Sequence, residues 1–505
     1  MSKIINLLKK NIFILILLII SVQTFWRMLP AGMFSTQDFH FFRQLEFDKC
    51  VKSLQIPCRW APDAGLGYGE PLFNFYGQFS YAVGEIYHLL GGSIIGSVKF
   101  LFVLSLLGSG VTMFFLAKRI WKNNYAAMIS SVIYLYAPYR AVDVWVRGAL
   151  PEAFSFILFP LIILFIDKYI ENKKFIDIFW FSLFLGVLII THNLSLVMFA
   201  PLLAVWIIFR LFESKNWKLL PWIILSVVAS SLLMAFYILP VVFESKFIDL
   251  GSTITGYFDF HNHFVTSFEL FVSSFWGYGA SVWGPNDGLS LAVGYLQWIL
   301  PILTLAVLVI KKKIFENKEF IILFVLGWFY LFLTHNKSTF IWEHLPFMAY
   351  IQFPWRFLGM AVFCFALAAG LIVTFFDKWK IWLTVLVCAV AVCLNFSFFR
   401  EDIWYKVNDV YFTTGAEWVR QRSASIADFW PNLGHNIPDK PSDGKYINYF
   451  PGWISLTPEV DGLIPAKGSV LTDTPTRRIG NIISLIALFG FVVAFVTRNK
   501  WKKEI

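Results

Sequence analysis

The chain has 505 residues, of which 58% are hydrophobic and only 15% are charged. A water-soluble protein of this length needs far more polar surface, so the composition excludes a soluble globular protein and indicates an integral membrane protein. The formal net charge of +10 is accounted for by short basic loops between apolar segments, so it does not call for a nucleic-acid partner.

The N-terminal stretch MSKIINLLKKNIFILILLII has a basic lead, an apolar core and no small-x-small cleavage site. We interpret it as a retained signal anchor whose N-terminus lies in the cytoplasm. A spanning helix needs about 20 residues, and apolar segments near that length predict about twelve transmembrane helices, at roughly 12–29, 94–116, 125–138, 153–166, 175–191, 194–210, 219–240, 291–310, 319–334, 357–376, 380–399 and 479–497.

The charges support this assignment. If each apolar segment crosses once, every short basic loop falls on the side of the N-terminus, as the positive-inside rule requires. Both termini are then cytoplasmic, and the active face of this cell-membrane protein is extracytoplasmic. The basic loops are 118–122, 168–174, 210–218, 311–318, 377–380 and 498–503.

The remaining loops are expected outside, and they divide the chain into three parts. Residues 1–399 form the transmembrane catalytic module, with large outer loops at 30–93 and 241–290. Residues 400–478 form a small extracytoplasmic domain, expected to be β-rich because Pro, Gly and Asp separate short runs such as KYINYF and GWISL. Residues 479–505 are the last helix and a cytoplasmic tail.

The first outer loop is too polar to lie in lipid and too aromatic to be an ordinary solvated connector. Asp38 lies just after the first apolar segment, with His40 and Arg43 close by. A carboxylate there can act as a general base, and the histidine or arginine can tune it or hold an anion; the alternative is ordinary interface polarity. Cys50 and Cys58 share this loop and can pair if it faces an oxidising compartment.

The second outer loop reads APYRAVDVWVRGALPEAFSF. Arg140, Asp143 and Arg147 are three and four residues apart, so a helix places them on one stripe, and we expect an amphipathic helix lying at the surface. Two arginines there can clamp a phosphate with forked hydrogen bonds, or they can contact lipid headgroups. Glu152 falls in the first turn of the next helix, where it can also simply match the helix dipole.

Three further motifs carry candidate chemistry. THNLSL breaks an apolar run at His192, and IQFPWRF places Arg356 where a helix begins, as a phosphate ligand or an interfacial anchor. FDFHNHF offers Asp259, His261 and His263 as weak metal candidates, because no further ligands have a diagnostic spacing.

Taken together, several stretches resemble the GT-C superfamily of membrane glycosyltransferases. More closely, they resemble a bacterial family of multi-pass membrane proteins labelled as related to 6-pyruvoyl-tetrahydropterin synthase. The stretches are DFHFFR, RWAPDAGLGYGEPLFNFYG, RGALPEAFS, THNLSL, WGYGASVWGPNDGLSLAVG, IQFPWRFLG, YFPGWISL and TPTRRIGNIISL.

The resemblance implies an all-α, GT-C-like fold and a polyprenyl-phosphate sugar donor. It also implies that Asp38 is the catalytic base, that Glu152 is a second-loop acid, and that Arg147 and Arg356 bind the donor phosphate. Many GT-C enzymes carry two adjacent acids in the first loop, whereas Phe39 and His40 follow Asp38 here. This departure leaves a divalent metal cofactor open, and no other cofactor is implied.

We therefore expect a glycosyltransferase that moves a sugar from a lipid-phosphate donor to an extracytoplasmic glycan, lipid or protein acceptor. Its predicted substrate-binding residues also include aromatic rings that stack on sugars, and the full set is His40, Arg43, Trp60, Tyr68, Tyr76, Arg140, Arg147, His192 and Arg356. A transporter or lipid flippase is one alternative, although such proteins usually place ionisable groups near the bilayer midplane. A non-catalytic cell-envelope assembly protein displaying residues 400–478 is another.

Overall fold

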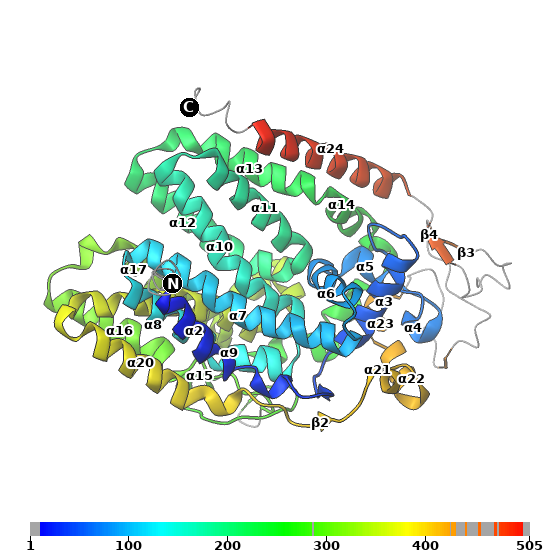
Figure 1. Cartoon of the computed structure of the whole chain (residues 1–505), viewed down its shortest axis with the longest axis horizontal. Coiled ribbons are helices and arrows are strands. Elements are labelled where there is room, and N and C mark those ends of the chain that lie inside the picture. The colour runs from blue at the N-terminus through cyan, green and yellow to red at the C-terminus, as the bar shows by residue number, and fades with distance from the viewer. Residues whose placement is uncertain are drawn as a thin grey trace, which may run out of the picture.

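The computed structural model is mostly helical and is shown in Figure 1. The described residues also form two two-stranded antiparallel sheets: β1 (Met33–Phe34) pairs with β2 (Trp404–Tyr405), and β3 (Trp453–Ser455) pairs with β4 (Ser469–Leu471). The structure describes residues 11–284, 287–424, 426–430, 440–441, 453–455, 469–471 and 474–497.

Each of the twelve predicted apolar segments contains a helix. Among the described residues, six helices are long and apolar enough to cross a membrane, and two bent pairs bring the number to eight if each pair is one span. Four others are shorter, at 11 to 17 residues, so the count of twelve crossings stays a prediction. The main helices are α2 (Ile12–Val22), α7 (Ile94–Trp121), α8 (Asn124–Leu135), α10 (Leu150–Asn172), α11 (Phe175–Thr191), α12 (Asn193–Ser214), α13 (Leu220–Leu233), α14 (Ala235–Glu244), α16 (Tyr295–Ile310), α17 (Lys318–Thr334), α19 (Leu358–Ala369), α20 (Lys380–Asn395) and α24 (Pro475–Thr497).

Three of the basic loops begin where a long helix ends in a left-handed residue. Helices α7, α10 and α12 end at Lys122, Lys173 and Lys215, whose φ angles are 50°, 54° and 51°. This conformation stops a helix, and a positive charge there interacts favourably with the helix dipole. The lysines therefore lie where these helices end, and the predicted orientation places them on the cytoplasmic side.

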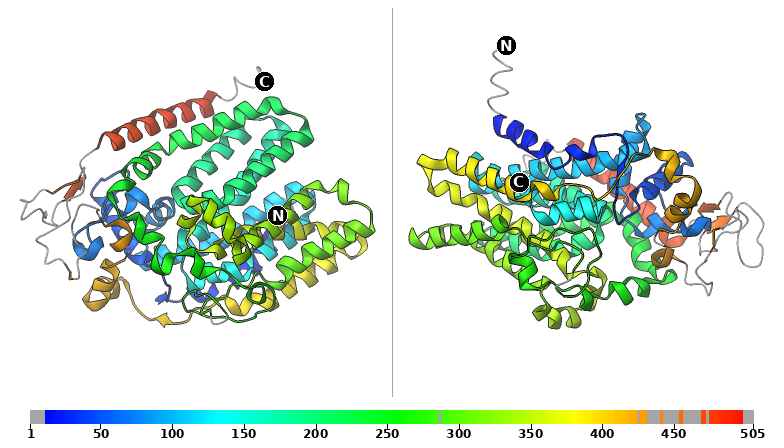
Figure 2. Two further views of the ribbon diagram at one scale, coloured as in Figure 1. Left: turned by 180° about the vertical axis from the view of Figure 1, so that it is seen from behind. Right: turned by 90° about the horizontal axis from the view of Figure 1, so that it is seen from below.

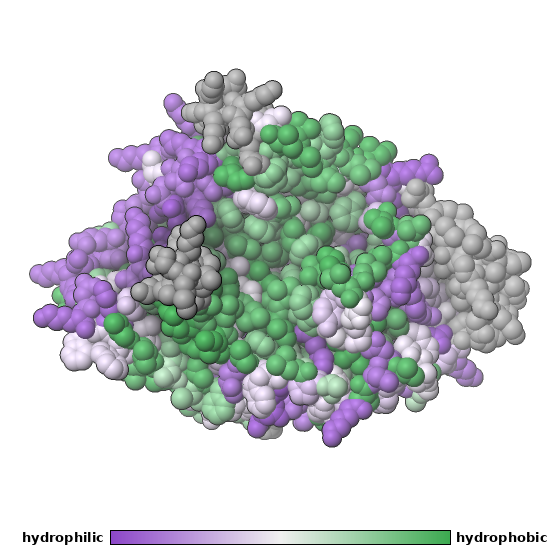
Figure 3. Space-filling view, viewed as in Figure 1, coloured by the Kyte–Doolittle hydropathy of each residue, from purple (hydrophilic) through white to green (hydrophobic). Residues whose placement is uncertain are grey.

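The basic ends of four helices meet in one ion-pair network. Arg119 Nε of α7 and Arg210 Nε of α12 each lie 2.8 Å from an oxygen of Asp167 in α10. Arg210 Nη1 also lies 3.0 Å from Glu319 Oε1 in α17. These four basic segments thus share one end of the helix bundle, as their predicted common side requires. Figure 3 shows an apolar band between hydrophilic residues on the left and right.

Topology reporters will test this orientation. A reporter fused after Lys122 or Lys313 should show a cytoplasmic signal, and a reporter fused at Gly444 should show an extracytoplasmic signal. The reason is that short loops rich in lysine and arginine are kept on the cytoplasmic side of the membrane. The measurement is paired alkaline phosphatase and green fluorescent protein fusions. A cytoplasmic signal at Gly444 would contradict the side assigned to every loop.

At the opposite end, the first outer loop folds into α3 (His40–Lys52), α4 (Ala64–Gly67), α5 (Leu72–Phe75) and α6 (Phe79–Leu89), shown in blue in Figures 1 and 2. Residues 404–430 pack against it: Phe412 stacks on Phe41 at 4.7 Å between ring centroids, and Trp418 lies 6.0 Å from Phe42. Segments from opposite ends of the chain therefore build this end together.

Residues 404–430 correct the expectation of a β-rich segment. Their described part contains the two-residue strand β2 and three short helices, α21 (Asp409–Phe412), α22 (Gly415–Arg422) and α23 (Ile426–Phe429). The α22 sequence GAEWVRQR is rich in helix formers, and this local preference decides its conformation. Further on, β3 and β4 form one short sheet, and 431–439, 442–452, 456–468 and 472–473 lie outside the described residues, so a β-rich character of the rest of this segment stays a prediction.

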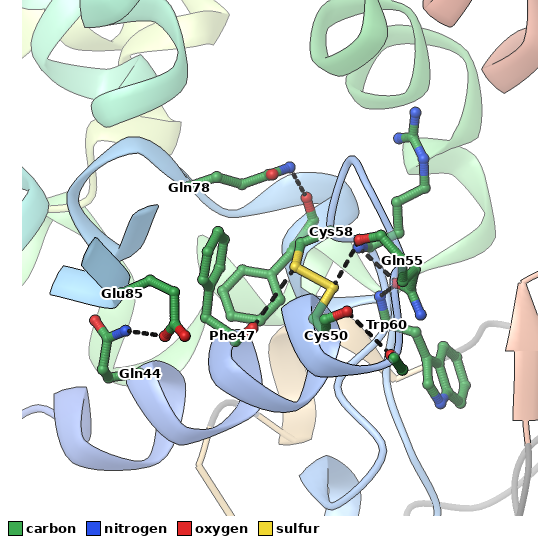
Figure 4. Close-up of a disulfide and its surroundings, with 11 residues drawn as sticks. Gln44, Phe47, Cys50, Gln55, Cys58, Trp60, Gln78 and Glu85 are labelled. Atoms are coloured by element: carbon green, nitrogen blue, oxygen red, sulfur yellow. Dashed lines mark hydrogen bonds between the residues drawn. A yellow bond between two sulfur atoms is a disulfide. The ribbon is translucent and has the colours of Figure 1, made fainter. Parts of the chain in front are cut away.

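The structure contains a disulfide between Cys50 and Cys58, which confirms the pairing considered for the first loop (Figure 4). Both cysteines are buried. The intervening turn is held by Gln55 Oε1, which accepts hydrogen bonds from Arg59 N at 2.9 Å and Trp60 N at 2.8 Å. A disulfide at this position fits a loop that faces an oxidising compartment.

Candidate active site

The first element of the site is the Asp38 carboxylate at the start of α3. Its Oδ1 accepts hydrogen bonds from Phe39 N at 2.8 Å and from Arg43 Nη1, one helical turn further on. His40 Nε2 lies 3.3 Å from Asp38 Oδ2. The Asp38 side chain is 28% exposed, whereas those of His40 and Arg43 are buried. The structure thus brings together the three residues that the sequence singled out, with the carboxylate accessible.

Asp38 is an ionised group. Burial raises the pKa of Asp38. The Arg43 guanidinium, His40 and the hydrogen bond from Phe39 N lower the pKa by more than burial raises it, so the resulting pKa is about 2. The carboxylate therefore carries its charge throughout the physiological pH range. It can accept a proton or a hydrogen bond from a substrate hydroxyl without first losing a proton.

His40 positions this loop, because both of its ring nitrogens contact other groups of the protein. Its Nδ1 is 2.8 Å from Tyr81 Oη, and its Nε2 contacts Gly148 O and lies 3.2 Å from Leu150 N. Burial lowers the pKa of His40 to about 4, so the ring is neutral at neutral pH. The ring ties α3 to α6 and to the second outer loop.

The second outer loop forms α9 (Pro138–Ala141) and a π-helical turn, η2 (Val142–Val146), and both are buried. The prediction of a helix lying at the surface is therefore wrong, because its charged side chains point inward and pair with buried carboxylates. Arg147 Nη1 donates to Asp143 Oδ1 at 2.8 Å, Glu152 Oε2 at 3.0 Å and Tyr139 Oη at 3.3 Å. Tyr139 Oη also donates to Glu152 Oε1. Because it is buried, Arg147 does not lie on the outer surface of the protein, where bulk lipid headgroups would contact it.

Two further arginines join this cluster. Arg140 is fully buried, 3.6 Å from Asp143 Oδ2 and 4.0 Å from the Phe156 ring. Arg356 Nε lies 3.7 Å from Glu152 Oε2. Three guanidinium groups thus share two carboxylates, and burial and the Glu152 carboxylate raise the pKa of Asp143. The cluster has a surplus of at least one positive charge and favours an anion beside it.

A pocket of about 510 Å³ joins the two loops, and we call it the main pocket. Asp38 and Arg43 line it from the first loop and Arg147 from the second. The Trp355 ring lies 4.6 Å from the Arg147 guanidinium and forms part of the wall. Asp428, in α23, also lines the pocket, although it lies hundreds of residues further along the chain than the two loops. One cavity therefore presents an ionised carboxylate, two cations and aromatic surface.

The lining residues that sequence reasoning missed include Tyr257, Trp355 and Asp428. Trp355 precedes Arg356 in IQFPWRF, so its position beside a candidate arginine was the available clue. Asp428 is one of many acids in the 400–478 segment, and nothing in its neighbourhood in the sequence marks it.

Several predicted residues lie behind the main pocket instead of lining it. Glu152 is buried beneath Arg147 and Tyr139, where it orients the arginine. Arg140 is enclosed by the helices, and Arg356 Nη1 donates to Ile351 O at 2.8 Å. His192 precedes α12, and its Nδ1 lies 2.7 Å from Ser195 Oγ. All four support the site from outside its wall.

The aromatic residues expected to stack on sugars also lie elsewhere. Trp60 is buried in a small cluster with Phe75, and Tyr68 packs edge-on against Trp430. Tyr76 lies beneath Arg43, 4.5 Å from its guanidinium carbon, and holds that cation in place. None of these three rings lines the main pocket. These rings lie away from the pocket because their large apolar surfaces pack closely against other side chains.

The metal candidates do not converge. His261 pairs with Asp259 at 2.7 Å, but His263 is buried and bonds to Ser281 Oγ at 3.1 Å and Tyr257 O at 2.5 Å. These residues were only weak metal candidates, and the structure engages both His263 ring nitrogens within the protein. Among the described residues, no group of three or more histidines, cysteines or acids is arranged to hold a metal ion, so no step is assigned to one here.

One wall of the main pocket depends on Asp287. Trp355 Nε1 donates to Ser281 Oγ at 3.0 Å, and Ser281 Oγ lies 3.4 Å from Asp287 Oδ2. Leu289 N donates to Asp287 Oδ1 at 2.8 Å. Burial raises the pKa of Asp287 to about 7. This carboxyl therefore titrates near neutral pH, next to two residues that line the pocket.

We expect Asp287 to make stability fall as pH rises from about 4 to about 7. In that range the folded protein holds a proton that the unfolded chain has lost, so raising the pH favours unfolding, and above about pH 7 the effect is constant. Thermal unfolding in nanodiscs at about pH 5 and about pH 8 measures it. Asp287→Asn should reduce the difference between the two midpoints, and an unchanged difference would contradict the assignment.

The structure thus defines a membrane protein with a bundle of apolar helices and a charged pocket at one end. The chain belongs to the family of membrane proteins described by the 6-pyruvoyl-tetrahydropterin synthase related domain, whose model matches residues 73–406. This confirms the resemblance seen in the sequence. Comparison with curated proteins gives no match.

Among solved structures, similar chains are membrane glycosyltransferases of the GT-C type. The oligosaccharyltransferase AglB from Archaeoglobus fulgidus, in complex with an inhibitory peptide and a dolichol-phosphate, is 11% identical with a TM-score of 0.46, over 83% of this chain and 56% of its own. The mycobacterial arabinofuranosyltransferase AftD is 12% identical with a TM-score of 0.46, over 81% of this chain and 30% of its own. This chain spans little more than half of the length of the first relative and less than a third of the length of the second. The likeness in fold therefore does not by itself assign a function to this chain.

Proposed function

We propose that the protein is a membrane glycosyltransferase that moves a sugar from a polyprenyl-phosphate donor to an acceptor hydroxyl on the extracytoplasmic side. One observation carries the proposal: the main pocket is lined both by Asp38, whose carboxylate is ionised, and by Arg147, which belongs to a cluster with surplus positive charge. Such a pocket suits a reaction in which a hydroxyl loses a proton while a phosphate gains charge.

Asp38 accepts the proton of the acceptor hydroxyl as that oxygen attacks the anomeric carbon of the donor sugar. The bond between this carbon and the phosphate oxygen breaks, and the phosphate leaves with the electron pair. Arg147 and Arg43, which line the same pocket, stabilise the charge that develops on the leaving phosphate. The proton on Asp38 then passes to solvent or phosphate and restores the carboxylate.

The size and walls of the main pocket suit the head of such a donor. Its volume of about 510 Å³ falls within the range of about 300–1,000 Å³ typical of ligand sites. Phe353 and Trp355 stack on each other at 4.8 Å between ring centroids and give the wall an apolar face. An apolar face suits a sugar ring or the first units of a prenyl chain, while the rest of the tail stays in lipid.

Donor turnover tests this function directly. Purified protein in lipid nanodiscs is incubated with a panel of polyprenyl-phosphate sugars, and released polyprenyl phosphate is quantified by mass spectrometry. At least one donor should be consumed, and cell-envelope glycans should lose a sugar when the gene is deleted. Consumption of no donor, together with unchanged glycans, would exclude the proposed function.

A further inference from the structure

A second, smaller pocket of about 170 Å³ is also lined by Asp38. Asp38 and Phe39 line both pockets. The remaining walls of the smaller pocket come in equal parts from residues 33–41 and from residues 405–421, which include Tyr411, Glu417 and Gln421. The Asp38 carboxylate thus stands at the boundary between two cavities of different composition.

We propose that the smaller pocket binds the acceptor, and that the group it accepts is a neutral, hydroxyl-bearing sugar unit. This inference rests on the proposed glycosyl transfer and adds to it the place and chemical class of the acceptor. A hydroxyl in the smaller pocket would reach Asp38 while the donor phosphate occupies the main pocket. Three observations support the assignment.

The first observation is charge. Arg420 donates to Glu417 through Nε at 2.8 Å and Nη2 at 2.7 Å, and it stacks over the Phe39 ring at 4.7 Å. The cation of this pocket is therefore matched by Glu417, while Asp38 adds a negative charge. The described lining residues of this cavity therefore carry no surplus positive charge, whereas the cluster around Arg147 at the main pocket does. The smaller pocket thus disfavours a phosphate and favours a neutral ligand.

The second observation is an unused hydrogen-bond acceptor. Gln421 is only 3% exposed, and its Nε2 donates to Glu417 Oε1 at 2.7 Å. This bond fixes the orientation of the amide, and Gln421 Oε1 then accepts no hydrogen bond from the residues that the structure describes. A buried polar atom left without a partner destabilises a protein, and a ligand hydroxyl beside it would remove that cost.

The third observation is shape. At about 170 Å³, the cavity is smaller than the roughly 300 Å³ at which drug-sized ligand sites begin, so it holds one small unit of a larger acceptor. Tyr405 and Tyr411 contribute half-exposed rings, 37% and 43% accessible. Tyrosine combines an apolar face with a polar tip, and this suits a sugar ring that carries both kinds of surface.

The test uses methyl glycosides of common hexoses as neutral probes and saturation-transfer NMR on the full protein in nanodiscs. At least one glycoside should bind the wild type. Gln421→Met keeps the size of the side chain but removes the amide, so it should weaken that binding about three- to tenfold, as expected for one hydrogen bond. Tyr411→Leu should also weaken it, and because Tyr411 is exposed, this variant does not depend on the packing around Gln421.

Tyr350→Leu is the matched control, because Tyr350 is also 43% exposed and lines neither pocket. Its glycoside affinity should equal that of the wild type. Equal affinity in Gln421→Met and Tyr411→Leu, or the absence of any glycoside binding to the wild type, would overturn the acceptor assignment.

A second probe, farnesyl phosphate, separates this inference from the proposed function. It should bind the wild type and Gln421→Met equally and bind Arg147→Lys more weakly. Glycoside binding that depends on Gln421, without farnesyl phosphate binding, would support the sugar site and contradict the lipid-phosphate donor. Farnesyl phosphate binding that weakens in Gln421→Met would place the anion in the smaller pocket and overturn the inference.

Discussion

Replacing Asp38 with asparagine should lower sugar transfer by about 10²–10⁴-fold, the usual contribution of general-base catalysis. Asparagine keeps the size of the side chain and can still accept a hydrogen bond from Phe39 N, but it cannot take a proton at neutral pH. The structure strengthens this expectation, because Asp38 lines both pockets. Its side chain is 28% exposed, so the substitution should change stability little.

The measurement is transfer by purified protein in nanodiscs, normalised to monodisperse protein. Asp63→Asn is a matched control, because Asp63 lies in the same loop, is 32% exposed and pairs with Lys49. It lines neither pocket and should keep full activity. Near-normal transfer by Asp38→Asn would exclude Asp38 as the base, and Asp428 would become the carboxylate to test, since it lines the main pocket.

Replacing Arg147 with lysine should raise the KM for the donor by about 10- to 100-fold, equivalent to one lost charge-assisted hydrogen bond. Lysine keeps the charge but not the planar fork that matches a phosphate. Arg147 also holds Asp143 and Glu152 at 2.8 Å and 3.0 Å, and a single ammonium cannot bond both carboxylates and a ligand in the same geometry. The effect should fall on donor binding more than on acceptor binding.

Arg27→Lys provides the control for this variant. Arg27 makes a two-pronged bond to Glu401, through Nε at 2.8 Å and Nη2 at 2.7 Å, and neither residue lines either pocket. It should leave the donor KM unchanged, although it loses a comparable fork. Steady-state kinetics with varied donor measures both variants. An unchanged donor KM in Arg147→Lys would show that Arg147 only holds the second loop together.

The sequence by itself determined the class of protein and the positions of its helices. Apolar length and the placement of lysines are local properties, and each of the twelve apolar segments contains a helix. The grouping of Asp38, His40 and Arg43 was equally local, because one turn of α3 separates its members. The Cys50–Cys58 pair was foreseeable for the same reason, because the two positions have a sequence separation of only 8.

Only the tertiary structure decided how these groups are used. The spacing of Arg140, Asp143 and Arg147 placed them on one stripe, but packing against Glu152 turned that stripe inward, since unpaired charges cannot be buried. Trp60 became a core residue because neighbouring apolar groups enclose it.

The same holds for the boundary between the two pockets. Asp428 and Gln421 reach the first loop across hundreds of residues, through the pairing of β1 with β2 and the stacking of Phe41 on Phe412. No local pattern in the sequence marks either residue as part of a site. Their roles arise from contacts between distant segments, and such contacts depend on the packing of the whole chain, which neither composition nor periodicity encodes.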